Sequence, residues 1–227
     1  MPNVQISAPS YDSKICHGAM AGIMQATLNP EIKTILRTCD CSALTRVFNT
    51  LWCMALNDRP TVTHFAMIHD DIVPQPGWLD IMLKIMEEKK CDVLSAIVPQ
   101  KTMQGLTSTA WDLGGGHYNI QRMTIKEAYN MDVTVADPNL LINTGLMLVD
   151  MTKDWVEKIV FRFEDDIIKK DGKFMPVEIS EDWYFSREAR KLGAILMATR
   201  AVKVKHMGRA AYSNEMPWGS LDHDVPA

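Results

Sequence analysis

The sequence predicts an α/β fold in which a mostly parallel sheet is flanked by helices within a single domain, residues 1–227. Short apolar runs alternate with amphipathic helical patterns over the first hundred residues, and the connections between them are short. With 47% apolar and 23% charged residues, the chain has the composition of an ordinary globular protein and can bury a core. No run approaches the ~18 apolar residues that cross a bilayer, so we expect no transmembrane segment.

Four strands and three helices are expected before residue 100. The strands are expected over 4–8, 32–37, 64–68 and 93–98, and the helices over 14–28, from an N-cap at Ser42 to the break at 58–60, and after Pro76-Gly77. Beyond the irregular stretch 100–140, we expect strands over 140–149 and 194–198 and helices over 155–168 and 183–192. The last dozen residues are expected to form a loose tail or a lid.

Polar residues follow three of the expected strands. These are the segments 9–12 (PSYD), 38–40 (TCD) and 69–71 (HDD). Ligands of open α/β sheets bind beyond the carboxyl ends of the strands, where such segments converge. The sequence therefore predicts a binding site at this edge of the sheet.

Asp70 and Asp71 are adjacent carboxylates at the end of an apolar strand. Carboxylate oxygens suit Mg²⁺ or Mn²⁺, and such ions bind through one or two carboxylates together with phosphate oxygens. The residues alone leave two interpretations open, a metal–diphosphate site or a solvated turn.

Glu181 and Asp182 open the segment 180–185 (SEDWYF), just ahead of an expected helix. Ser180 or Asp182 is a good helix cap. A carboxylate in a partly desolvated cleft is also a good general base, which removes a proton from an attacking hydroxyl. Both interpretations stay open on the residues alone.

The net charge of −4 conceals a basic segment. Residues 187–209 hold seven Lys or Arg and one Glu, and they include His206 near their end. A solvated helix face is one interpretation, and a set of phosphate ligands is the other. The acidic remainder of the chain argues against a broad nucleic-acid surface.

Several common sites are missing from the sequence. There is no Gly-Lys-Ser/Thr phosphate loop around residues 114–116 (GGG), no G-x-G-x-x-G after the first strand and no G-x-S-x-G elbow. Cys39 and Cys41 lack a second ligand pair at zinc-finger spacing. An odd number of cysteines, five, in a chain that begins without a signal-peptide pattern is typical of reduced thiols, so we expect a cytoplasmic protein.

Five stretches, taken in order, resemble a GT-A glycosyltransferase, most closely glycosyltransferase family 2. They are 42–56 (SALTRVFNTLWCMAL), 63–86 (THFAMIHDDIVPQPGWLDIMLKIM), 142–150 (INTGLMLVD), 180–193 (SEDWYFSREARKLG) and 204–208 (VKHMG). The resemblance implies a Rossmann-like sheet with a nucleotide-binding half over about 1–100 and an acceptor and catalytic half over about 101–227.

The resemblance also implies a role for each matching residue. Asp71 is implied as a metal ligand, Asp70 as a ligand of the ribose and of the metal, and His206 as the residue that completes the metal site. Asp182 is implied as the catalytic base, with Glu181 supporting it. The remaining implied contacts to the nucleotide-sugar are Pro9, Asp12, Asp40, Arg46, Asn143 and Gly145.

The implied activity is transfer of one sugar from a nucleotide-sugar, UDP being the expected nucleotide, to an acceptor hydroxyl, with inversion and with Mn²⁺ or Mg²⁺ as cofactor. The acceptor class and the oligomeric state stay open. His69 stands where the family has an Asp, which weakens the metal assignment, and the Q-x-x-R-W motif of processive members is missing. Trp111, His117 and Trp183 are candidates either to stack on an acceptor sugar or to fill the core.

Two rival functions remain. A nucleotidyltransferase that acts on a sugar phosphate would want a Gly-rich basic loop after the first strand, and residues 7–14 (SAPSYDSK) contain no glycine. A non-catalytic protein that binds a sugar nucleotide or a glycan would share the fold and lack turnover.

Overall fold

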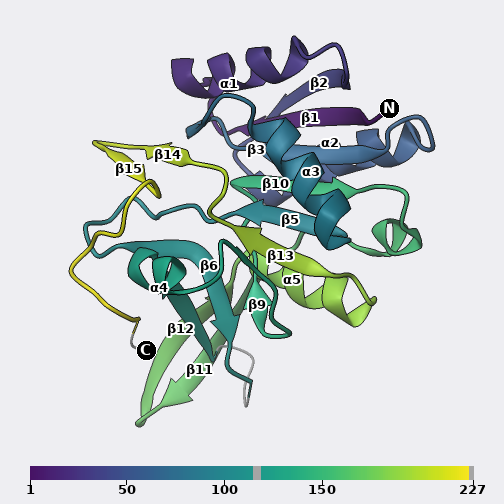
Figure 1. The fold of residues 1–227 in the computed structure, drawn as a ribbon. Coiled ribbons are helices and arrows are strands. Elements are labelled where there is room, and N and C mark those ends of the chain that lie inside the picture. The colour runs from purple at the N-terminus through teal and green to yellow at the C-terminus, as the bar shows by residue number, and fades with distance from the viewer. Residues whose placement is uncertain (115–118, 225–227) are drawn as a thin grey trace.

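A computed structural model describes residues 1–114 and 119–224 and shows a mixed α/β fold around a seven-stranded sheet (Figure 1). The strand order is β2-β1-β3-β10-β5-β13-β8. In that order the strands are Lys33–Asp40, Asn3–Ser10, His64–Ile68, Leu146–Asp150, Val93–Ala96, Leu196–Thr199 and Thr134–Val135. The sheet therefore contains the strands expected from the apolar runs.

The sheet is mostly parallel, with two reversals. β1 runs parallel to β2 and to β3, and β5 runs parallel to β13. β10 lies antiparallel between β3 and β5, and β8 is antiparallel at the edge. The apolar run 140–149 is interrupted at 142–145, because β9 (Leu140–Leu141) pairs with a different sheet from β10.

Helices cover both faces of the central sheet (Figure 1). Alternation along β3 separates the faces, since Phe65 and Met67 pack into one core and Ala66 and Ile68 into the other. The first core includes residues of α2 (Leu44–Asn57) and α5 (Glu181–Lys191), and the second includes residues of α1 (His17–Thr27) and α3 (Trp78–Lys89). The helices thus hold the carboxyl ends of β1, β2 and β3 at one edge.

Smaller sheets extend the central one. β6 (Leu106–Asp112) pairs with β7 (Ile120–Thr124) and β9, and α4 (Ile125–Asn130) follows β7. β14 (Val204–Met207) pairs with β4 (Ile72–Pro74) and β15 (Ala211–Ser213). Pairing of His206 with Ile72 brings the late histidine to the turn that follows β3.

The predicted helix over 155–168 is wrong. The structure has a short 3₁₀ helix, η1 (Asp154–Lys158), followed by a hairpin of β11 (Glu164–Lys170) and β12 (Lys173–Ile179). Trp155, Val156 and Ile159 have the spacing of a helix face, and all three are buried in the core of α2 and α5 although the chain is not α-helical there. The Asn49 side chain donates to the Phe161 carbonyl at 2.8 Å and accepts from its N–H at 2.9 Å, which holds this segment extended.

Two smaller expectations also change. Ala43, not Ser42, occupies the N-cap of α2. The end of the described chain is fixed rather than loose, because Asp222 pairs with Lys126 at 2.6 Å and Asp224 accepts from the Arg122 N–H at 3.1 Å. Among the helices of the described residues, none combines the length and the apolar character needed to cross a membrane.

Candidate functional site

The carboxyl ends of β1, β2 and β3 bring together the polar segments singled out in the sequence. Ser10 pairs with Asp40 across β1 and β2, and the Ser13 hydroxyl donates to Asp40 Oδ2 at 2.7 Å. Pro9 lies one residue earlier in the same register. Asp12 forms an exposed ion pair with Lys14 at 2.5 Å.

Asp70 lies beside this group. The Cys16 N–H donates to the Asp70 carbonyl at 2.8 Å, which ties the start of α1 to the end of β3. Burial raises the pKa of the Asp70 carboxyl, and the charges of Asp71 and Asp12 raise it further, while hydrogen bonding with Ser10 lowers it. The predicted contacts Pro9, Asp12, Asp40 and Asp70 thus share one edge of the sheet.

Asp71 faces His206 and Lys101. His206 Nε2 lies 3.4 Å from Asp71 Oδ2, and the Lys101 ammonium forms an ion pair with the same oxygen. Burial raises the pKa of Asp71, but the hydrogen bonds and charges of these two partners outweigh burial and hold it well below its ordinary value. Lys101 was missed in the sequence because it lies in an irregular loop after β5.

The Pro99 carbonyl fixes the orientation of the His206 ring. Its Nδ1 lies 2.8 Å from the Pro99 carbonyl, which only accepts, so Nδ1 carries a proton. Nε2 then either carries a second proton and donates to Asp71, or offers its lone pair to a cation. A backbone carbonyl that fixes the far nitrogen is the arrangement typical of a metal-bound histidine.

The donor set fits a divalent ion only in part. Asp71 and His206 supply one oxygen and one nitrogen. Within residues 1–114 and 119–224, no cluster of three or more His, Cys, Asp or Glu side chains is placed to bind a metal. Ions of the Mg²⁺ type often complete their shell with phosphate oxygens and water, and an imidazole ligand favours Mn²⁺ over Mg²⁺. The pair therefore fits an ion that arrives with, or is completed by, a diphosphate.

His69 is a buried neutral side chain. Desolvation lowers its pKa to about 4, so the imidazole is uncharged at neutral pH. Its Nε2 lies 3.2 Å from the Thr144 hydroxyl, and its ring centroid lies 5.3 Å from that of Phe48 on α2. At the position where the resemblance places an Asp, this chain thus has a group that packs between α2 and the 142–145 loop.

The loop 142–145 joins the two halves of the candidate site. At one end, the Ile142 N–H donates to the Ser186 hydroxyl at 3.0 Å, and that hydroxyl donates to the Asp182 carbonyl at 2.8 Å. At the other end, the His69 N–H donates to the Gly145 carbonyl at 2.9 Å. A chain of hydrogen bonds therefore runs from the first turn of α5 to the end of β3.

Asn143 holds this loop in shape. Its buried amide donates to the Ala96 carbonyl at 2.8 Å and to Thr109 Oγ1 at 3.3 Å, and its oxygen accepts from the Gly145 N–H at 3.1 Å. Donor and acceptor are thus both engaged inside the protein. A Cβ at Gly145 would lie 3.2 Å from the same Asn143 oxygen, so the close turn favours glycine.

Asp182 lies in the first turn of α5. Its Oδ1 accepts from the Trp183 N–H at 2.9 Å and from the Ser180 hydroxyl. Desolvation raises the pKa of Asp182 to about 7, with the charge of Glu181 adding to it and the two hydrogen bonds opposing it. Burial also raises the pKa of Glu181. Asp182 is therefore a carboxyl that titrates near neutral pH at the rim of the core.

Arg122 on β7 completes this part of the site. Its guanidinium carbon lies 4.4 Å from the centroid of the Trp183 ring, and the charges of Asp182, Asp224 and Glu178 act on it. The sequence interpretation missed Arg122, because the stretch 100–140 has no clear periodicity. Asp224, at the end of the described chain, lies beside Arg122 and accepts from its N–H.

Other predicted residues lie apart or serve the core. Arg46 is on the exposed side of α2 and lines a different pocket, with Asn49 and Cys53 among its neighbours. Trp183 is buried and donates to the Ser108 carbonyl at 3.1 Å, and Trp111 packs against the core. His117 and residues 115–116 of the glycine run lie outside the described residues.

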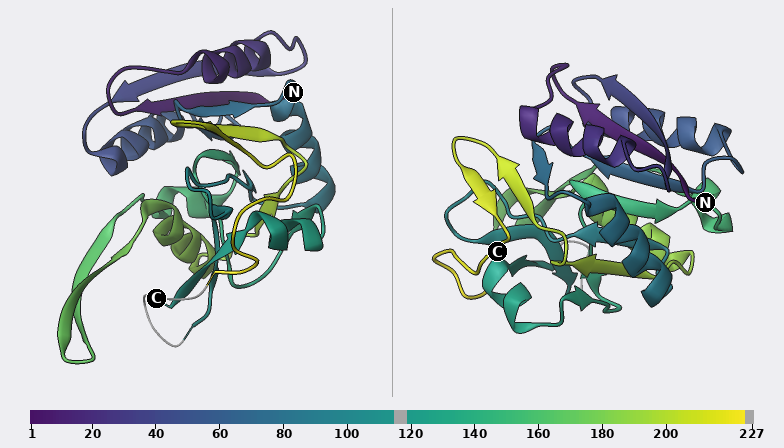
Figure 2. Two further views of the ribbon diagram at one scale, coloured as in Figure 1. Left: turned by 90° about the vertical axis from the view of Figure 1, so that its left-hand side faces the viewer. Right: turned by 45° about the horizontal axis from the view of Figure 1, so that its top comes forward.

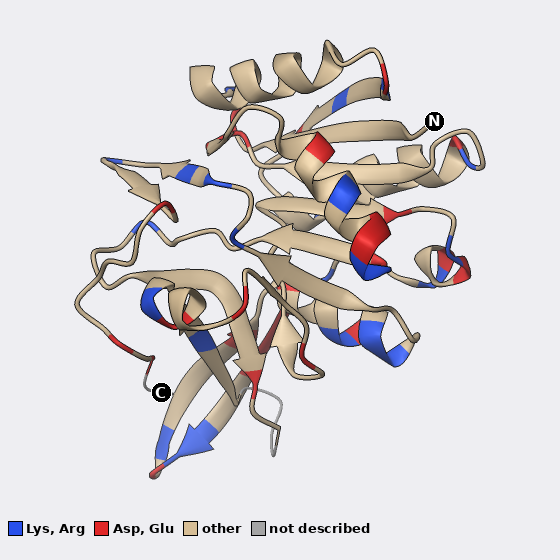
Figure 3. Cartoon of the chain, in the orientation of Figure 1, with Lys and Arg blue, Asp and Glu red and all other residues tan. Residues whose placement is uncertain are grey.

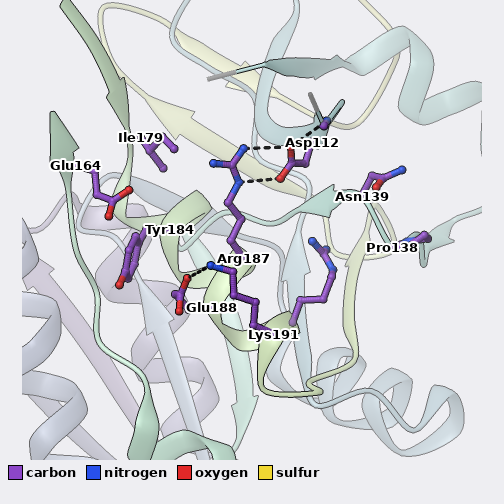
Figure 4. Close-up of a pocket in the computed structure, with 11 residues that line it drawn as sticks. Asp112, Pro138, Asn139, Glu164, Ile179, Tyr184, Arg187, Glu188 and Lys191 are labelled. Carbon is purple, nitrogen blue, oxygen red and sulfur yellow. Dashed lines mark hydrogen bonds and ion pairs between the residues drawn. The ribbon is translucent and has the colours of Figure 1, made fainter. Parts of the chain in front are cut away.

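The basic segment 187–209 does not gather around Asp71. Its helical part instead faces a pocket of about 660 Å³ between α5, the β11–β12 hairpin and the end of β6 (Figure 4). There the Arg187 guanidinium donates two hydrogen bonds to the Asp112 carboxylate, of 2.7 and 3.0 Å, and Lys191 forms an ion pair with Glu188 at 2.6 Å. Among the described residues that line this pocket, none is a predicted catalytic or metal residue. The helical part of this segment, for which two interpretations are open, is not placed at Asp71, where the basic side chains are His206 from the segment and Lys101 from outside it.

No protein-family model and no curated protein matches the sequence. Among solved structures, the chain is similar to the crystal structure of A197 from STIV, with a TM-score of 0.57 and 15% identity over 99% of this chain and 97% of that one. A weaker likeness joins it to a crystal structure of S. aureus TarS 1-349, with a TM-score of 0.46 and 12% identity over 88% of this chain and 58% of that one. At these identities, the first likeness concerns the fold alone, and the second adds nothing to it.

Proposed function

We propose that this chain is a GT-A-type glycosyltransferase, resembling family 2, that moves one sugar from a nucleotide-sugar to an acceptor hydroxyl with inversion. UDP is the expected nucleotide. The observation that carries the proposal is the 142–145 loop, which ties Ser186, one turn after Asp182, to His69 beside the Asp70–Asp71 pair. Three residue steps reach at most about 10 Å. The loop therefore keeps the first turn of α5 and the turn after β3 close to each other, as a site for one sugar between a base and a diphosphate requires.

In this proposal Asp182 is the general base. The acceptor oxygen attacks the anomeric carbon while its proton passes to the Asp182 carboxylate, and the bond from that carbon to the diphosphate oxygen breaks with its electrons. A base with a pKa near 7 is matched to neutral pH. Glu181 supports it by the charge that helps raise this pKa.

The departing diphosphate needs positive charge. A Mn²⁺ or Mg²⁺ ion supplies that charge when it is bound. Asp71 and His206 are placed to hold it, with Asp70 beside them as the proposed ligand of the ribose. Lys101 brings a fixed cation to the same place. Pro9, Asp12, Asp40 and Gly145 remain the proposed further contacts to the nucleotide-sugar, with Asn143 proposed to position Gly145. Arg46 lines a separate pocket and is not one of these contacts.

The same proposal divides the chain by role. Residues from 1 to about 100 provide most of the nucleotide-binding half, and residues from about 101 to 227 provide the acceptor and catalytic half, with Lys101 and His206 reaching back to Asp71. The acceptor is a hydroxyl-bearing glycan, metabolite or other molecule. The proposal places the protein in the cytoplasm, since its five cysteines are free thiols and cytosolic thiols are kept reduced.

A two-stage experiment tests the proposal. A panel of nucleotide-sugars is first screened by thermal shift with and without MnCl₂, because a ligand of the native state raises the melting temperature. The best donor is then incubated with the protein, and nucleoside diphosphate release is measured for the wild type and for Asp182→Asn. The proposal expects a Mn²⁺-dependent shift and a release that depends on Asp182.

The rivals give different results. A nucleotidyltransferase would release pyrophosphate from a nucleoside triphosphate and a sugar phosphate. A binding protein would show the thermal shift without any release, in the wild type and the variant alike. A panel in which no nucleotide-sugar shifts the melting temperature would count against the transferase and against a sugar-nucleotide-binding protein, and would leave a glycan-binding protein as the alternative.

A further inference from the structure

The β11–β12 hairpin stands out from the body of the protein. The two strands form a sheet of their own, and Figure 2 shows the pair projecting away from the rest of the chain. Asp171 and Gly172 turn the chain with positive φ angles of 51° and 79°, as an Asp-Gly hairpin turn requires. Register from Glu164↔Ile179 to Lys170↔Lys173 runs without a break. The hairpin is thus a regular ribbon that is packed at its base through the buried Ile179 and exposed along its distal half.

One face of this ribbon is unusually apolar for an exposed surface. Residues that face each other across an antiparallel pair share a side, so Ile167, Lys169, Phe174 and Pro176 lie together on one face. The side chains of Phe174 and Ile167 are 75% and 71% exposed. Lys169 Nζ lies 5.6 Å from the centroid of the Phe174 ring, which confirms that the two share this face. We call these four residues the ribbon face.

Charge is divided along the hairpin. The distal ten residues, 167–176, hold three Lys and one Asp, although the chain as a whole has a net charge of −4. The acidic residues of the hairpin other than Asp171 lie at its base, and they are Glu164, Asp165, Asp166 and Glu178. Figure 3 shows this division, with blue toward the tip and red nearer the body. The distal half is therefore a cationic, apolar element on an acidic protein.

We propose that the distal half of this hairpin docks on an anionic membrane surface. The ribbon face would lie against the bilayer with Phe174 and Ile167 at the boundary of headgroups and acyl chains. Lys169 on the ribbon face would extend its ammonium group to the anionic headgroups, whereas Lys170 and Lys173, which pair with each other on the opposite face, would add longer-range attraction at the tip. The carboxylates at the base are repelled by such a surface, so contact is confined to the distal half. The proposal does not depend on the activity proposed above.

Area and charge favour a membrane over a protein partner. Four side chains cover far less than the ~1,000 Å² that a specific protein interface needs. A bilayer requires no complementary shape, and apolar area and lysines add to one another in interfacial binding. A second copy of this chain, recruited to the open strand edges, is the competing occupant and is an outcome of the test below.

Vesicle co-sedimentation tests the proposal with the full chain. Vesicles of phosphatidylcholine alone are compared with vesicles that contain about 30% phosphatidylglycerol, at low and at high salt. We expect binding to the anionic vesicles, weakened by salt. Lys169→Gln should weaken it by about fivefold, Lys170→Gln and Lys173→Gln on the opposite face by less, and Phe174→Ser by about tenfold or more. Lys84→Gln and Leu28→Ser, at equally exposed sites on other elements, should bind like the wild type.

A reporter variant keeps the test independent of these losses. Phe174→Trp should show a blue-shifted fluorescence difference from the wild type when anionic vesicles are added, because the indole leaves water. An unshifted spectrum, or equal binding to both kinds of vesicle, would overturn the proposal. So would hairpin variants that leave vesicle binding unchanged but dissociate a dimer in light scattering, which would assign the ribbon face to a second copy. Far-UV circular dichroism checks that each variant is folded.

Discussion

Nε2 of His206 lies 3.4 Å from Oδ2 of Asp71, although the two residues are 135 positions apart in the sequence. Pairing of β14 with β4 brings them together, and the Pro99 carbonyl fixes the ring from the other side. Lys101 adds its ammonium to the same carboxylate. Lys101 therefore places a positive charge beside Asp71 whether or not the imidazole of His206 is protonated.

The first prediction concerns the metal. Asp71→Asn and His206→Ala should each remove most of the gain in UDP affinity that Mn²⁺ provides, because each deletes one of two protein ligands. We expect a loss of about 10- to 100-fold, measured by calorimetry with and without Mn²⁺. Asp58→Asn, at a surface ion pair with Arg37, is the control and should behave like the wild type. Unchanged Mn²⁺ dependence in both site variants would remove the ligand assignment.

Lys101 provides a second prediction. Lys101→Met should weaken UDP binding by about tenfold even without metal, because a charge-assisted contact to the phosphates is lost. Lys101→Arg should keep part of that affinity. The free energy of unfolding should change by no more than about 1 kcal/mol, since both partners of this ion pair are partly exposed. Equal UDP affinity in the Met variant and the wild type would show that Lys101 serves Asp71 alone.

Asp182 carries the third prediction. Asp182→Asn should reduce turnover by about 10²- to 10⁴-fold, because an amide cannot accept the acceptor's proton, while donor affinity stays the same. In the wild type, turnover should rise with pH through about 7 as the carboxyl ionises. Glu188→Gln, also on α5 but at the separate pocket, is the matched control. Full turnover in Asp182→Asn would leave the base unidentified.

Much of the central sheet could be predicted because its signal is local. The apolar runs at 4–8 and 64–68 are strands in the structure, and the polar segments after them share one sheet edge. Lys101 and Arg122 could not be found in this way, because each meets its partner through a fold-level contact from an irregular stretch. The helix expected over 155–168 failed for a related reason. Burial of Trp155, Val156 and Ile159 gives the sequence a helical spacing, although the chain there is 3₁₀ or extended.

The last prediction concerns stability and its dependence on pH. Asp182 has a folded-state pKa of about 7, raised by burial above the ordinary value of 3.8. Between these two values the folded state binds more protons than the unfolded state, so this group makes the free energy of unfolding fall as pH rises from about 4 to 7. Asp182→Asn removes the effect and keeps an oxygen that accepts from the Trp183 N–H. The variant should therefore be more stable than the wild type at pH 8 by about 1–3 kcal/mol, and the gain should vanish near pH 4.

Asp112→Asn is the control with the opposite sign. Burial raises the pKa of Asp112, but the hydrogen bonds from Arg187 and the Gly114 N–H, together with the charges of Arg187 and Arg190, outweigh burial, so the folded-state pKa lies below the ordinary value. This carboxylate stabilises the fold above its unfolded pKa, and the contribution is lost only as pH falls through the lower folded value. Asp112→Asn should therefore destabilise the protein by a constant amount from pH 5 to 8. Urea unfolding of both variants across pH 4–8 measures the two profiles. The contrary result is a free energy of unfolding of Asp182→Asn that differs from that of the wild type by the same amount at every pH, as expected for Asp112→Asn. That result would mean that Asp182 is an ordinary ionised carboxylate and not a base tuned to neutral pH.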